Sequence, residues 1–142
     1  MAEQNFQNHT KWDPPFHFFI SPVILGTLLF SAKHAYAYPN GITLWLVLLS
    51  ATLFVWLIKT RTYALAVQDR LIRLEERLRM EKLLTPELMA RTGELTVAQF
   101  VALRFASDGE LDGLVSRTLD EKLNPKQIKA AIQTWRPDHT RI

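Results

Sequence analysis

Two long apolar stretches near the start of the chain constrain its fold more than any other feature. The first covers residues 16–32 and the second residues 42–58, and neither contains Lys, Arg, Asp or Glu. A helix needs about 17 to 25 apolar residues to cross the hydrocarbon core of a bilayer. The nine residues between the stretches are too few for a folded domain. The sequence therefore predicts a transmembrane helical hairpin, with spans at about 16–36 and 42–58, followed by a soluble tail.

The rest of the chain divides by composition into shorter segments. Residues 1–13 form an N-terminal segment, and residues 14–58 form the hairpin. Residues 59–84 are rich in Leu, Arg and Glu and lack Pro and Gly, which favours a continuous helix from about Thr43 to about Leu84. Residues 85–136 are expected to form a small helical module, and residues 137–142 a tail. No strand pattern appears, so we expect an all-α fold.

The placement of charge predicts how the hairpin is oriented. Residues 59–82 carry seven Lys or Arg against four Asp or Glu, whereas the hairpin loop holds only Lys33. Positively charged flanks stay on the cytoplasmic side of a membrane. We therefore expect a multi-pass protein of the bacterial inner membrane with both termini in the cytoplasm. The basic segment also suits anionic lipid headgroups. Glu75, Glu76 and Glu81 interrupt it, which argues against nucleic acid as a partner.

A cleaved signal peptide is the main alternative for the first stretch. Ala35, Tyr36 and Ala37 resemble a cleavage site after a hydrophobic region. Two observations oppose this alternative. The leading segment has Glu3 and Asp13 beside one lysine, so it is not a basic region, and a second apolar stretch follows at once.

An apolar stripe along the helix after the second span is the best candidate for a functional surface. Its members recur at alternating spacings of three and four residues, which is typical of a coiled-coil seam. The stripe covers only about two heptads, so it can either associate with another helix or pack against the C-terminal helices of the same chain. The candidate interaction residues are the apolar Val67, Leu71, Leu74 and Leu78 and the basic Arg70, Arg73 and Arg77.

Capping signals predict four short helices after residue 84. Thr85 and Pro86 open the first, and Gly93 is expected to end it. Thr96 with Gln99 has the spacing of a capping box. The same spacing recurs at Ser107 and Glu110, and Asn124 with Pro125 opens the last helix. Apolar residues, Trp135 among them, supply the core of this module.

No catalytic or cofactor site is expected from the sequence. The chain has no cysteine, which excludes disulfides and thiolate ligands. His17 and His34 lie at opposite ends of the first span, about 25 Å apart along a helix. Within one chain they therefore cannot bind the same metal ion or haem group. Haem held between histidines of different subunits is a minor alternative. We therefore expect a protein that is not an enzyme and that binds no cofactor or metal.

Three sequence runs resemble an uncharacterised bacterial family. These runs are residues 2–9, residues 68–79 (QDRLIRLEERLR) and residues 102–108 (ALRFASD). Members of that family are small two-span membrane proteins classed as a domain of unknown function, and some are loosely labelled transporter permeases. The resemblance implies the same membrane hairpin but no activity. A permease needs more spans than two to line a pathway.

These observations favour a non-catalytic accessory, assembly or scaffold protein of a membrane complex. The hairpin would anchor the chain, and the C-terminal module would be presented in the cytoplasm. A regulatory subunit of a transporter or channel is the alternative. Either role requires a membrane protein partner or a second copy of the chain.

Overall fold

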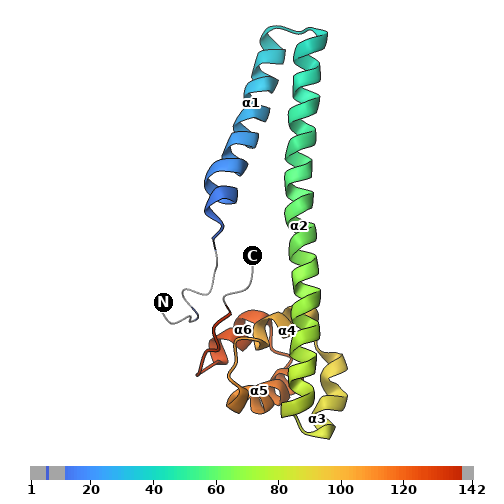
Figure 1. Ribbon diagram of the computed structural model, residues 1–142, viewed down its shortest axis with the longest axis vertical. Helices are drawn as coiled ribbons and strands as arrows, with labels where there is room; N and C mark the ends of the chain where they lie inside the picture. The colour runs from blue at the N-terminus through green and yellow to red at the C-terminus, as the bar shows by residue number, and fades with distance from the viewer. Residues whose placement is uncertain (1–5, 7–11, 139–142) are drawn as a thin grey trace. The chain divides into compact units, whose positions relative to one another are not determined.

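The computed structural model describes residue 6 and residues 12–138, and in these residues the fold is all-α (Figure 1). A π-helix, Pro15–Ile20, precedes α1 (Ser21–Ala37), and α2 (Gly41–Leu83) is the longest element. The expected single helix from about Thr43 to about Leu84 is confirmed. Four short helices follow: α3 (Pro86–Arg91), α4 (Val97–Leu103), α5 (Asp108–Glu121) and α6 (Pro125–Ala131). A 3₁₀ turn, Thr92–Glu94, follows α3.

Within the described residues the chain divides into two compact units. One contains Trp12–Leu65, and the other contains the described residues from Ala66 to Asp138 together with Phe6. Helix α2 contributes its first part to the first unit and its last part to the second. The second unit therefore contains the short helices together with the end of α2.

The first unit is a hairpin of α1 and α2 in which small polar side chains lie between the helices. Ser31 and Ser50 are buried, and their hydroxyl oxygens are 2.8 Å apart. Asn40 caps α2, because its side-chain oxygen accepts hydrogen bonds from the backbone N–H groups of Ile42 (2.9 Å) and Thr43 (3.0 Å). The turn before Gly41 is thus stabilised by an Asn cap.

The first helix is irregular immediately before Pro22. The six residues Pro15–Ile20 form wider π-helical turns, and α-helix begins at Ser21. A proline lacks a backbone N–H group and its ring crowds the carbonyl four residues earlier. A wider turn at that point reduces the crowding, and π-turns are a known cause of irregular helices.

Two helical segments of this fold are long and apolar enough to cross a membrane. They are Pro15–Ala37, with 23 residues, and Gly41–Leu83, with 43 residues. Only 6% and 11% of their most apolar windows lie buried. Within these windows few side chains are buried by the rest of the chain.

The short helices of the second unit begin where local capping predicts. In the Thr96 box, the N–H of Gln99 donates to the Thr96 hydroxyl at 3.3 Å, and the N–H of Thr96 donates to the Gln99 side chain at 2.8 Å. Asn124 and Gln127 repeat this arrangement at the start of α6. One detail differs from expectation: α3 ends at Arg91, and Gly93 lies in the 3₁₀ turn after it.

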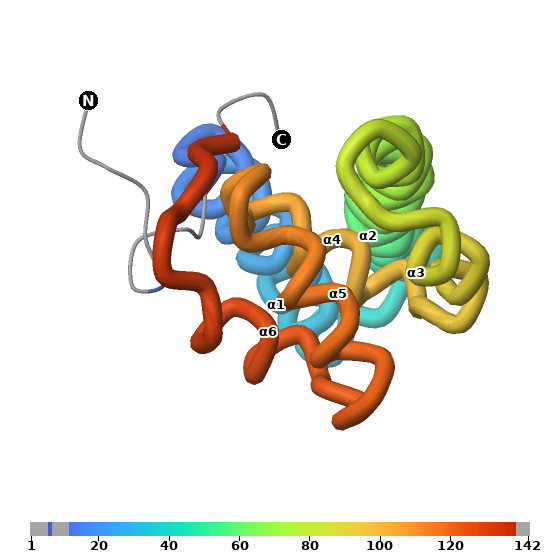
Figure 2. The backbone as a smooth tube through the Cα atoms, turned by 90° about the horizontal axis from the view of Figure 1, so that it is seen from below, coloured from blue at the N-terminus to red at the C-terminus, as the bar shows by residue number. Residues whose placement is uncertain are grey.

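The core of the second unit joins the four short helices to α2. Its fully buried side chains include Phe100, Leu103 and Phe105 from the α4 region, Ile128 from α6, and Met80 from α2. Trp135 is half-buried, with its ring centroid 5.1 Å from that of Phe105. Figure 2 shows α3 to α6 gathered on one side of α2.

A hydrogen bond between two charged side chains links α3 to α5. The Arg91 guanidinium donates to Asp120 at 3.0 Å, and this bond raises the pKa of Arg91 above its ordinary value. Arg91 is partly exposed to solvent and Asp120 is exposed, so the pair positions the two helices without adding much stability.

The end of α5 provides a test of local strain. Lys122 adopts a left-handed backbone conformation, with φ of 52°. This conformation costs a residue with a Cβ atom roughly 1–2 kcal/mol, and glycine avoids that cost. We expect Lys122→Gly to raise the free energy of unfolding of the second unit by about 1 kcal/mol. Ala130→Gly, at an exposed position of α6, is the control and should lower it by up to about 1 kcal/mol. Peptide-resolved hydrogen exchange of the full chain in detergent would measure both.

Candidate functional site

The apolar seam predicted from the sequence, Val67, Leu71, Leu74 and Leu78, is exposed in the structure. The exposed fraction of these side chains lies between 52% for Leu78 and 66% for Val67. All four belong to the part of α2 in the second unit. The sequence left open whether this stripe packs against the C-terminal helices of the same chain. In the structure those helices pack elsewhere.

The C-terminal helices pack against a different face of α2. Ile72, Glu76 and Met80 are buried there, at a spacing of four residues. An α-helix turns about 100° per residue, which places this face about 170° from the seam around the axis of α2. The two faces are therefore nearly opposite. The module occupies one, and no described residue covers the other.

A buried carboxylate fixes the module on its face of α2. Glu76 is only 4% exposed. It accepts hydrogen bonds from Arg79, at 2.9 Å, and from Arg136, at 3.2 Å. Arg79 also donates to the Asp108 carboxylate at 2.7 Å and to the carbonyl oxygen of Ala106 at 2.8 Å. The cluster ties α2 to the start of α5 and to the chain after α6.

The environment of Glu76 depends on a contact outside its own helix. A spacing of three residues along one helix would by itself pair Glu76 with Arg79 on the solvent surface. The pair forms, but both side chains face the module, with 5% and 12% of their side-chain surface exposed. The decisive partner, Arg136, lies 60 residues away in the chain, so spacing along one helix could not reveal it.

The basic residues beside the seam lie in two different environments. Arg70 and Arg77 are exposed, as is the acidic Glu75, and none of these three makes an ion pair with a described residue. Arg73 instead lies toward the module, where its guanidinium is 5.8 Å from the ring centroid of Phe100. Of the three predicted basic residues, Arg70 and Arg77 therefore remain on the free surface.

The histidines that the structure describes, His17 and His34, belong to the hairpin unit. The ring of His17 is 2.8 Å from the carbonyl oxygen of Asp13, and the ring of His34 stacks on Phe30 with centroids 6.1 Å apart. His9 and His139 lie outside the described residues. Among the residues that the structure describes, no group of three or more His, Cys, Asp or Glu side chains is placed to hold a metal ion.

The chain belongs to a family of unknown function, designated DUF6526, which it matches over residues 1–142. This confirms the expected membership of an uncharacterised family. No curated protein and no solved structure is significantly similar to the chain.

Removing the charge of Glu76 tests whether its cluster holds the module on α2. Glu76→Gln keeps the shape of the side chain but weakens two hydrogen bonds from guanidinium groups. We expect it to lower the free energy of unfolding of the second unit by about 2 kcal/mol. Glu75→Gln, one residue earlier and exposed, should change it by less than about 0.5 kcal/mol. Hydrogen exchange in the α5 peptides would report both, and equal effects of the two variants would contradict this role for the cluster.

Proposed function

We propose that this member of the family is a non-catalytic accessory, assembly or scaffold protein of the bacterial inner membrane. In this proposal α1 and the first half of α2 anchor the chain in the bilayer. The second unit is held in the cytoplasm, where the seam binds a protein partner. One observation carries the proposal: apolar side chains cover the outside of the hairpin, while the second unit has a buried core of its own.

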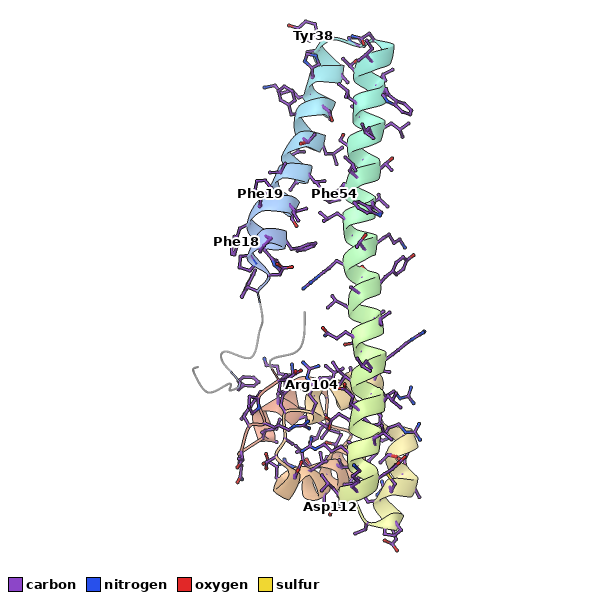
Figure 3. The ribbon with its side chains drawn as sticks, in the orientation of Figure 1. Phe18, Phe19, Tyr38, Phe54, Arg104 and Asp112 are labelled. Atoms are coloured by element: carbon purple, nitrogen blue, oxygen red, sulfur yellow. The ribbon has the colours of Figure 1, made fainter. Side chains whose placement is uncertain are left out.

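The surface of the hairpin suits lipid better than water. Phe18 and Phe19, in the π-helix before α1, are 70% and 67% exposed (Figure 3), and Trp45 and Trp56 on α2 are similarly exposed. Burying one large apolar side chain contributes about 1.5–3 kcal/mol, so leaving many of them in water is costly. Soluble monomers rarely expose contiguous apolar patches larger than a few hundred Å². A bilayer removes this cost for all of these side chains at once.

The properties of the two apolar helices match a membrane anchor better than the core helix of a soluble protein or a cleaved signal sequence. The core helix of a soluble protein is mostly buried, whereas these windows are only 6% and 11% buried. A cleaved signal sequence would separate α1 from α2. The hydroxyl contact between Ser31 and Ser50 joins these two helices within the hairpin, which favours retention of both.

Charge at one end of the hairpin supports the orientation. Lys59 and Arg61 follow the apolar part of α2, and the Arg61 guanidinium lies 5.1 Å from the ring centroid of Phe16. This contact places the start of the first helix and the end of the second apolar stretch at the same end of the hairpin. Basic residues there favour the cytoplasmic side. They also favour anionic headgroups, by about 1 kcal/mol for each cation near the surface.

The exposed seam supports a binding role. It lies outside the apolar stretches, on the part of α2 that packs with the module, and no described residue covers it. A scaffold protein and a regulatory subunit of a transporter or channel would both use such a surface. They differ in the identity of what they bind. Purification from native membranes in mild detergent, followed by mass spectrometry, would distinguish them, with Leu71→Asp/Leu74→Asp as the variant that lacks the seam.

The proposed topology has a direct test. A reporter fused after residue 142 should be active only as a cytoplasmic reporter, and one inserted at Pro39 only as a periplasmic reporter. The untagged protein should stay in the membrane pellet after extraction with alkaline carbonate. A periplasmic C-terminus, or release by carbonate, would contradict the proposed anchor.

A further inference from the structure

We propose that the partner of the seam is a second copy of this chain. The two seams would pair as a short parallel coiled coil in which Arg70 of each chain faces Glu75 of the other. This inference rests on the proposed membrane anchor, because the anchor sets the relative orientation of the two copies.

The spacing of the seam assigns its heptad positions. Leu71 and Leu78 are seven residues apart and take position a, and Val67 and Leu74 take position d. Arg70 and Arg77 then fall at position g, and Glu75 falls at position e. These are the positions that flank the seam and face the partner helix. Exposure of all four apolar side chains leaves the stripe free to pair.

The flanking charges match those of a second copy. In a parallel pair, a residue at g faces the residue at e of the following heptad on the other helix, five positions later. Arg70 therefore faces Glu75 of the second copy, and the two-fold symmetry of a dimer produces this pair twice. Both side chains are exposed and make no ion pair with described residues of their own chain.

The position of the module leaves room for a second copy. The module packs on the face of Ile72, Glu76 and Met80, which lies about 170° from the seam. Pairing of two seams therefore does not compete with folding of the second unit. Two copies that insert in the same direction hold their α2 helices parallel and at the same depth. Each residue of the seam then lies opposite the same residue of the other copy.

The seam has a defined end. The d position that follows Leu78 is occupied by Glu81, and Arg77 would face Lys82 of the second copy. Both features oppose pairing beyond Leu78. Two heptads alone are short for a stable coiled coil, but confinement in one membrane raises the effective concentration of the two helices.

Cysteine crosslinking in native membranes tests the contact. The chain has no cysteine, so Leu74→Cys introduces a single thiol into the seam. We expect oxidation to produce a disulfide-linked dimer of the full-length protein. Lys126→Cys, exposed on the module, is the matched control and should produce several-fold less dimer. Equal crosslinking of the two variants would overturn the proposal.

Charge reversal identifies the occupant of the seam. In the Leu74→Cys background, Arg70→Glu opposes two carboxylates in each pair, and Glu75→Arg opposes two guanidinium groups. Each variant alone should reduce the crosslinked fraction about fivefold. When the two variants are expressed together with different tags, every pair again has opposite charges, so crosslinking between the tags should recover. Only a second copy in parallel register predicts this recovery.

The outcomes separate this inference from the proposed function. Protein that resists carbonate extraction but yields no seam crosslink would keep the membrane anchor and overturn the dimer. A crosslink that does not recover in the mixed charge variants would overturn the Arg70–Glu75 register. Capture of a different protein through Leu74→Cys, with no dimer, would assign the seam to another partner. Release by carbonate would contradict the anchor itself.

Discussion

The unbroken backbone of α2 is the constraint on which the other features depend. Between Ile42 and Leu83 the chain contains neither proline nor glycine, so the helical hydrogen bonds continue and the direction of each side chain is fixed by its position. The first part of this helix pairs with α1 in the hairpin. The last part presents Ile72, Glu76 and Met80 to the module and the seam to its surroundings. One helix thus supplies surfaces of three different kinds.

The contrast between the two faces at the end of α2 is chemical as well as geometric. The face toward the module includes a buried carboxylate held by Arg79 and Arg136. Such a group is stable only where its partners are in place, because an unpaired buried charge is costly. This requirement makes docking of the module selective for one face. The seam is purely apolar and imposes no such requirement, and in the proposed dimer its selectivity comes from the charges beside it.

Local patterns predicted much of this fold because they depend on neighbouring residues. The Thr96 and Asn124 caps involve partners three residues away, and the long helix follows from the absence of Pro and Gly. The face of α2 that receives the module was not predicted. Glu76 interrupts the apolar spacing between Ile72 and Met80, so that stripe resembled a polar surface, whereas the spacing of the seam fitted both internal packing and association with another helix. The orientation of Arg73 toward Phe100 depends on the same tertiary contact. The exposed seam itself was predicted as a candidate surface from spacing alone.

The separation of Glu76 from Arg136 affects the order in which the second unit assembles. Their contact closes a loop of 60 residues, whereas the capping contacts close loops of three. Loop closure loses entropy with the logarithm of length, so the longer loop costs about 3 kcal/mol more to close at the outset. The short helices and their mutual packing lower that cost by bringing residues 133–136 toward α5, where Glu110 accepts hydrogen bonds from the N–H groups of Gln133 and Thr134. On this argument we expect the contact between Glu76 and Arg136 to form late in folding, after the local contacts of the second unit.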